Sequence, residues 1–340
     1  MRQAPEEEPV PYSRQVELPG RGVTRIWECA GPRGAQTLIL IHGVTFTAEL
    51  NWGKVFASLG HHFRVIAVDL RGHGDGISPR SPFCLEDCAD DVAALAQVCG
   101  ISSFVAVGYS MGGMVAQLLH RRHASLLSGL VLCSTASNVL ESPVEKLTLP
   151  TMIGAMHWNP VLHLLSAEIL GMALVGQVDD PEAVRWARAQ LGRTTLSAAV
   201  SAIQAACRFD SSGWISQIDV PTAIIVTVRD RVVPVSRQLK LARAIPAASL
   251  HIMDADHGVC ITAPHLFAQA LLKACWSVEA NRRGALATEC KPVALTPCSV
   301  PSRAPSLPCS VPSRAPCPFA APILTLAHIF LEDRDRASGW

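Results

Sequence analysis

The segment Val105 to Gly113 constrains the fold of this chain more than any other stretch. The apolar run from Ser103 to Val107 is typical of a buried strand, and Met114 to Arg122 has the apolar spacing of a helix. Between them stands Gly108-Tyr109-Ser110-Met111-Gly112, a G-x-S-x-G pattern at a strand-to-helix junction. Because glycines lack a Cβ atom, strand and helix can approach closely there. Such a turn presents the Ser110 hydroxyl above the sheet as a candidate nucleophile.

The pentapeptide alone leaves a second interpretation open, since a glycine-rich strand–helix turn occurs in many α/β proteins. A serine hydroxyl is a poor nucleophile until a base takes its proton and an acid orients that base. The nucleophile interpretation therefore predicts a carboxylate and then a histidine downstream, each at the end of a strand. The helix that starts after Ser110 also offers free N–H groups and a positive dipole end, which suit a developing oxyanion.

Both downstream residues are present. Asp230 follows the predicted strand Thr222 to Val228, and His257 follows the short predicted strand Ser249 to Met253. Each alone has a simpler interpretation, Asp230 as a helix cap and His257 as a surface loop residue. Together, the order Ser…Asp…His at three strand ends predicts a catalytic triad, with Ser110 as nucleophile, His257 as general base and Asp230 as its orienting acid.

The rest of the chain up to about residue 280 alternates strand and helix patterns. Further predicted strands are Thr37 to Ile41, Phe63 to Asp69 and Gly129 to Cys133. Further predicted helices are Leu85 to Val98, Ser236 to Ala244 and Ala263 to Trp276. This rhythm predicts right-handed crossovers, and so an α/β fold with a mostly parallel central sheet and helices on both faces.

Three other segments differ from this rhythm. Residues 1–24 form a polar leader that feeds into a first hairpin, ahead of the main domain at 25–280. At about 138–218 strand signals disappear, and helical patterns at Leu149 to Gly176 and Pro181 to Cys207 predict an inserted helical cap. Residues 281–340 are rich in Pro, Ser and Cys, with a repeat that we expect to be disordered or locally extended. A role of this tail as a polyproline ligand stays open.

Composition excludes several classes of partner. A formal net charge of +1 gives no electrostatic reason to expect nucleic acid. No apolar run reaches the ~18 residues of a membrane span, and the acidic N-terminal segment lacks the apolar core of a secretory signal. The 12 cysteines are then expected to be reduced thiols in a cytoplasmic protein. The oligomeric state has no signal in the sequence.

Two groups of residues contain side chains that can bind metals but lack the residue spacing of a metal site. Cys84 and Cys88 stand four apart on a predicted helix, but no second ligand pair accompanies them, so buried thiols are expected. Asp69, His73 and Asp75 lie in a glycine-rich stretch, where a metal is conceivable and bracing of loops by hydrogen bonds fits better. We therefore expect no metal and no cofactor.

The stretch from about Val23 to Trp276 resembles the α/β-hydrolase superfamily, in particular the branch with bacterial esterases, haloperoxidase-like enzymes and C–C bond hydrolases. The motifs that carry the resemblance are Leu40-Ile41-His42-Gly43, Asp69-Leu70-Arg71-Gly72-His73-Gly74, Gly108 to Gly113, Asp230 followed by Pro234, and Asp256-His257-Gly258. The resemblance implies the triad named above, with the backbone N–H groups of Val44 and Met111 as the oxyanion hole. Epoxide hydrolases and dehalogenases of this fold have aspartate at the position of Ser110, which argues against both activities.

We therefore expect a serine hydrolase that cleaves a small-to-medium, apolar carboxylic ester, or a related acyl compound, through an acyl-enzyme. The predicted cap carries many apolar residues, and no Arg or Lys lies between Leu147 and Arg185 to bind an anionic substrate. A C–C bond hydrolase or a perhydrolase would use the same triad. A receptor-like binding protein with slow turnover is the alternative from another class.

Overall fold

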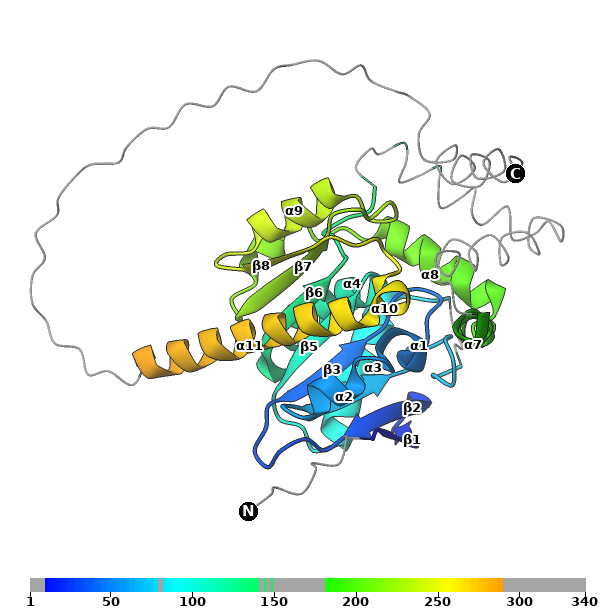
Figure 1. The fold of residues 1–340 in the computed structure, drawn as a ribbon, viewed down its shortest axis with the longest axis horizontal. Coiled ribbons are helices and arrows are strands. Elements are labelled where there is room, and N and C mark those ends of the chain that lie inside the picture. The colour runs from blue at the N-terminus through cyan, green and yellow to red at the C-terminus, as the bar shows by residue number, and fades with distance from the viewer. Residues whose placement is uncertain (1–9, 79–81, 141–143, 145–147, 149–180, 290–340) are drawn as a thin grey trace, which may run out of the picture. The chain divides into compact units, whose positions relative to one another are not determined.

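The computed structural model describes residues 10–78, 82–140, 144, 148 and 181–289, with the backbone alone for residues 285–289. All of them belong to one unit, Met1–Lys291. Eight strands of the described chain form one sheet in the order β1-β2-β4-β3-β5-β6-β7-β8 (Figure 1). The strands are β1 Tyr12–Leu18, β2 Gly22–Cys29, β3 Thr37–Ile41, β4 Arg64–Val68, β5 Phe104–Tyr109, β6 Leu127–Cys133, β7 Thr222–Thr227 and β8 Ser249–Met253.

The sheet is mostly parallel, which confirms the predicted α/β fold class. Among the eight described strands of this sheet, β1 pairs with β2 and β2 with β4 in antiparallel orientation. The strands from β4 to β8 in sheet order pair in parallel with their neighbours. Because parallel strands end at one edge of a sheet, the loops that follow β3, β5, β7 and β8 come close together there.

Helices cover both faces of the sheet (Figure 1). The helices are α1 Ala48–Trp52, α2 Phe56–Gly60, α3 Leu85–Val98, α4 Met111–His123, α7 Pro181–Leu191, α8 Leu196–Arg208, α9 Val235–Ala244, α10 Val259–Thr262 and α11 Pro264–Glu289. Buried residues of α3, α4 and α9 join one apolar core cluster, and those of α1, α2, α10 and α11 join the other. A sheet covered on both faces explains why its central strands are continuous apolar runs.

Strands β3 and β8 and helix α3 have the predicted bounds, whereas two predicted helices differ. The helix expected over 181–207 is two helices, because the Thr195 side chain accepts a hydrogen bond from Ala198 N (3.3 Å) and caps a new start at α8. The helix expected to end at Trp276 continues through Glu289.

The predicted leader and tail compare with the structure only in part. Strand β1 begins at Tyr12, so the first hairpin starts within residues 1–24. Residues 281–289, expected in the tail, form the end of α11. The predicted cap helix at 149–176 and the remainder of the tail lie outside the described residues. Among the residues that are described, no helix combines the length and the apolar character that crossing a bilayer requires.

Candidate active site

Ser110 occupies a strained turn between β5 and α4. Its backbone has φ 54° and ψ −118°, a conformation that non-glycine residues adopt only where the surroundings enforce it. A Cβ atom on Gly108 would collide with the Gly112 carbonyl, and one on Gly112 would collide with the backbone at the end of β3. The Ser110 N–H donates to the Cys133 carbonyl (2.9 Å), which ties the turn to β6. The predicted strand–turn–helix junction therefore has the close approach that its glycines permit.

Asp230 and His257 lie at the same edge of the sheet as Ser110. The three residues follow β7, β8 and β5, respectively. His257 Nε2 is 3.0 Å from Ser110 Oγ, and His257 Nδ1 is 2.7 Å from Asp230 Oδ2. Each of the three is only 7% exposed. In such a row, a histidine can take the serine proton on one nitrogen while the carboxylate holds the other nitrogen.

The loop that carries Asp230 orients its carboxylate. Oδ1 accepts hydrogen bonds from the backbone N–H groups of Val232 (2.9 Å) and Val233 (2.8 Å). Oδ2, the oxygen that faces His257, also accepts a hydrogen bond from the Thr227 hydroxyl (2.8 Å). Several donors on one carboxylate fix its plane.

The two aspartates nearest to His257 in the sequence have other partners. The Asp254 side chain pairs with Arg229 (3.0 Å) and is 76% exposed. Asp256 Oδ1 accepts a hydrogen bond from the backbone N–H of Gly258 (2.8 Å). Among the described carboxylates, Asp230 is the one whose side chain hydrogen-bonds to His257.

The loop after β3 passes close to Ser110 and carries Val44. A Cβ atom on Gly43 would lie 3.4 Å from Ser110 Cβ. The Gly43 N–H donates to Asn51 Oδ1 (2.9 Å), which fastens this loop to α1. Within the described part of the chain, the N–H groups of Val44 and Met111 donate no hydrogen bond.

The described part of the predicted cap contacts this same loop. At the end of α7, Gln190 Oε1 accepts a hydrogen bond from the Thr47 hydroxyl (2.9 Å), and its Nε2 donates to Glu49 (3.0 Å). In the turn after α7, the Thr194 hydroxyl donates to the Thr45 carbonyl (3.3 Å). Polar contacts therefore connect the helices inserted after β6 to the loop beside Ser110.

The residues after β4 brace loops. His73 Nδ1 lies 3.0 Å from the Arg71 carbonyl, and Arg71 Nε lies 2.7 Å from Asp91 on α3. Asp69 accepts a hydrogen bond from the backbone N–H of Asp75 (2.9 Å). Within residues 10–78, 82–140 and 181–289, no three His, Cys, Asp or Glu side chains are grouped so that they could hold a metal ion.

Burial shifts the titration of three side chains around these loops. It lowers the pKa of His42 to about 3 and the pKa of His73 to about 4, so both rings are neutral at neutral pH. Burial raises the pKa of Asp69 to about 6, against the opposing effect of its backbone donors. The neutral His42 ring accepts a hydrogen bond from Leu70 N (2.9 Å), a bracing role.

Two buried residues that touch Asp230 have no counterpart in the sequence prediction. Thr227 ends β7, and Gln238 lies on α9, both fully buried. One signal was available for Gln238. It stands three residues after Val235 and three before Leu241, at a position where an amphipathic helix carries an apolar side chain.

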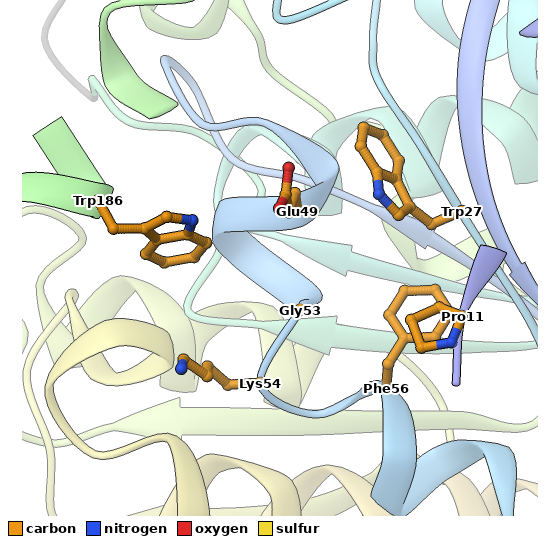
Figure 2. A pocket seen from close by; sticks show the side chains of 7 residues that line it. All are labelled: Pro11, Trp27, Glu49, Gly53, Lys54, Phe56 and Trp186. Atoms are coloured by element: carbon orange, nitrogen blue, oxygen red, sulfur yellow. The ribbon is translucent and has the colours of Figure 1, made fainter. Parts of the chain in front are cut away.

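A surface hollow of about 360 Å³ lies between β2, α1, α2 and α7, and Ser110, Asp230 and His257 are not among its lining residues (Figure 2). Figure 2 shows Trp27 and Trp186 on either side of Glu49. The Lys54 ammonium lies 5.7 Å from the centre of the Trp186 ring, within cation–π range. None of the lining residues is a predicted site residue.

Comparison with known proteins agrees with this architecture. Residues 36–264 match the family model described as alpha/beta hydrolase fold. A pimeloyl-(acyl-carrier protein) methyl ester esterase of Neisseria meningitidis is 30% identical over 246 residues, which are 70% of this chain and 92% of that protein. A poly(3-hydroxyalkanoate) depolymerase of Ectopseudomonas oleovorans is 25% identical over 268 residues, covering 78% of this chain and 93% of that protein.

Solved structures are similar over a comparable stretch. A thermophilic esterase from Thermogutta terrifontis has a TM-score of 0.67 and 25% sequence identity, covering 78% of this chain and 99% of that one. An enol-lactonase from Burkholderia xenovorans has a TM-score of 0.66 at 23% identity, covering 77% and 99% of the two chains. At that identity, the second likeness concerns the fold alone. On the family match and these relatives, the chain belongs to the alpha/beta hydrolase fold family and is a hydrolase.

Proposed function

We propose that this protein is a serine hydrolase that cleaves a small-to-medium, uncharged, apolar carboxylic ester through an acyl-enzyme. The observation that carries the proposal is the hydrogen-bonded row of Ser110, His257 and Asp230, with contacts of 3.0 Å and 2.7 Å. The name of one relative, a methyl ester esterase, describes an enzyme that acts on an ester and so supports the substrate class.

Acylation follows from the positions of these groups. His257 Nε2 takes the Ser110 hydroxyl proton as Oγ attacks the ester carbonyl carbon, and Asp230 stabilises the imidazolium that forms. The carbonyl oxygen becomes an oxyanion, which accepts hydrogen bonds from the N–H groups of Val44 and Met111. Met111 is the first residue of α4, so the positive end of the helix dipole favours this negative charge. His257 then gives its proton to the departing alkoxide, which leaves as the alcohol.

Deacylation repeats these steps with water as the nucleophile. His257 takes a proton from water as the water oxygen attacks the acyl carbon, and then returns that proton to Ser110 Oγ. The products are the carboxylic acid and the free serine.

The preference for a neutral substrate rests on the sequence of the predicted cap, which has no Arg or Lys between Leu147 and Arg185. A pocket with few polar groups suits an apolar acyl chain.

We also propose that the protein works in a reducing compartment such as the cytoplasm, because the eight cysteines of the described residues are free thiols.

Labelling with a fluorophosphonate probe and turnover of p-nitrophenyl esters test the proposal together. Ser110→Ala is expected to abolish labelling and to lower kcat by about 10⁴- to 10⁶-fold, as loss of a triad residue does in other enzymes. Ser103→Ala, which changes an exposed serine before β5, is the matched control and keeps both signals. Near wild-type turnover in pure Ser110→Ala protein would refute the assignment.

Substrate comparison separates the remaining chemistries. Neutral p-nitrophenyl esters of increasing acyl length are compared with a dienoate for C–C cleavage and with an ester plus hydrogen peroxide for perhydrolysis. We expect the highest kcat/KM for a neutral ester. A preference for the anionic dienoate over every neutral ester would overturn the substrate class, and labelling without turnover of any compound would favour a binding protein.

A further inference from the structure

Gln238 is a fully buried amide whose polar atoms all have partners in β7 or in the loop that carries Asp230. Its Oε1 accepts a hydrogen bond from the backbone N–H of Thr227 (3.0 Å). Its Nε2 donates to the Val233 carbonyl (2.8 Å) and lies 3.1 Å from Asp230 Oδ2. Because a backbone N–H needs an acceptor and a carbonyl needs a donor, these partners define which end of the amide is oxygen.

The protons of this cluster can be assigned in turn. Thr227 Oγ1 lies 2.8 Å from Asp230 Oδ2 and 3.1 Å from Gln238 Nε2. The amide nitrogen only donates, so towards Gln238 Nε2 the hydroxyl acts as acceptor. The single Thr227 proton has three acceptors within reach, Asp230 Oδ2 (2.8 Å), Ser134 Oγ (3.1 Å) and Gln238 Oε1 (3.3 Å), and the carboxylate oxygen is the nearest of them. Gln238 Nε2 has two N–H groups, and with one on the Val233 carbonyl the other is shared between Asp230 Oδ2 and Thr227 Oγ1, both 3.1 Å away.

The two carboxylate oxygens of Asp230 are fixed by different elements. Backbone amides of its own loop hold Oδ1, whereas Oδ2 has contacts to β7 through Thr227, to α9 through Gln238 and to His257. Gln238 also donates to the Val233 carbonyl. It therefore connects α9, which contacts Asp230 Oδ2, to the loop whose backbone amides bind Asp230 Oδ1.

We propose that Gln238 is a positioning residue for the hydrolytic reaction, which directs Asp230 Oδ2 at His257 Nδ1. This inference rests on the proposed function, in which Asp230 keeps the histidine proton on Nδ1. Gln238 does not touch the substrate. Its effect on the reaction passes through the carboxylate plane and through the tautomer of His257.

The test compares two buried glutamines. Gln117 on α4 is also fully buried, donates to the Ala136 carbonyl (3.1 Å) and accepts from the Ser211 hydroxyl (2.6 Å), but has no contact with Asp230. Gln238→Leu and Gln117→Leu each leave buried polar partners unpaired, so both are expected to lower Tm. Only Gln238→Leu is expected to lower kcat, by about tenfold or more, with KM within twofold of wild type.

A second readout does not depend on turnover. In the proton NMR spectrum, a proton on His257 Nδ1 that is bonded to Asp230 is expected to give a signal far downfield of the amide region. This signal is expected in wild type and in Gln117→Leu, and is expected to move upfield or broaden in Gln238→Leu. If the wild-type protein cleaved no ester while the signal still responded in this way, the proposed function would fail and the positioning role would stand.

A conservative variant covers the case in which Gln238→Leu does not fold. Gln238→Glu keeps an acceptor for the Thr227 N–H and, when protonated, an O–H donor towards Asp230. When ionised, it places a second negative charge beside that carboxylate. Its kcat relative to wild type is expected to fall as pH rises. The proposal is overturned if the NMR signal and kcat of the Gln238 variants match those of Gln117→Leu at every pH.

Discussion

The hydroxyl of Tyr109 donates a hydrogen bond of 2.6 Å to the backbone carbonyl of His257. Tyr109 directly precedes Ser110, so this contact ties the turn that presents the serine to the loop that presents the histidine. The ring is fully buried and packs against Phe267, with centroids 5.5 Å apart. Burial raises the pKa of Tyr109 well above its ordinary value, which keeps the hydroxyl protonated as a donor.

Tyr109→Phe is expected to keep the ring packing and to remove this donor. An unpaired buried carbonyl at His257 costs about 1–3 kcal/mol of stability. The histidine loop also loses a constraint, so we expect kcat to fall several-fold while KM stays near wild type. Urea unfolding and p-nitrophenyl ester kinetics measure the two effects. A stability loss with unchanged kcat would show that the hydroxyl supports the fold without aligning His257.

The second prediction concerns the identity of the acid. Asp230→Asn keeps the size of the side chain but removes the charge that stabilises the His257 imidazolium, and Asn can present its amide instead of an acceptor. Loss of this group in a triad lowers kcat by about 10⁴-fold. Asp256→Asn, which changes the side chain bound to Gly258 N, is the matched control and is expected to keep kcat within a few-fold. Greater damage from Asp256→Asn than from Asp230→Asn would reassign the acid.

Much of the fold could be predicted because burial imposes regular patterns on the sequence. Strand β3 is a continuous apolar run between polar loops, and α3 has acidic residues in its first turn and ends before Gly100. The break between α7 and α8 falls at Gly192-Arg193-Thr194-Thr195, where the prediction did not use two available signals, a glycine after α7 and the capping Thr195 before α8. The extension of α11 was missed because it depends on charged side chains, such as Glu279 with Arg282 and Arg283 one turn later.

Some residues of the candidate site could also be predicted from the sequence, and others could not. Ser110, Asp230 and His257 could be predicted because each stands at a strand end, and the order of strands in a parallel sheet brings such ends together. The contacts that Gln238 and Tyr109 make with the triad residues could not be predicted. Gln238 lies in a helix whose spacing predicts only that the position faces inward, and Tyr109 occupies a variable place in the motif. Which buried atom each of them reaches depends on packing between elements far apart in the sequence.

The last prediction concerns stability at acid pH. His73 is held neutral by burial with a pKa of about 4, against an ordinary value of 6.5. The unfolded chain therefore binds a proton that the folded chain does not between these values. The contribution of the neutral His73 ring to the free energy of unfolding is fully present above pH 6.5. This contribution falls as the pH drops towards 4, by up to about 1.4 kcal/mol per pH unit for one such group. His42, with a pKa of about 3, acts in the same direction. Asp69, whose pKa is raised from 3.8 to about 6, acts in the opposite direction between these two values and partly offsets both histidines.

His73→Asn removes this titration while its amide can still donate to the Arg71 carbonyl, the partner of His73 Nδ1. The free energy of unfolding in urea, measured from pH 7.5 to pH 4.5, is expected to fall less steeply in this variant than in wild type. The slope that remains should be the sum of the opposing contributions of His42 and Asp69. His61→Asn, at an exposed position, is the control for the loss of a histidine and is expected to keep the wild-type slope. Equal slopes for His73→Asn and wild type would show that His73 does not carry the acid sensitivity.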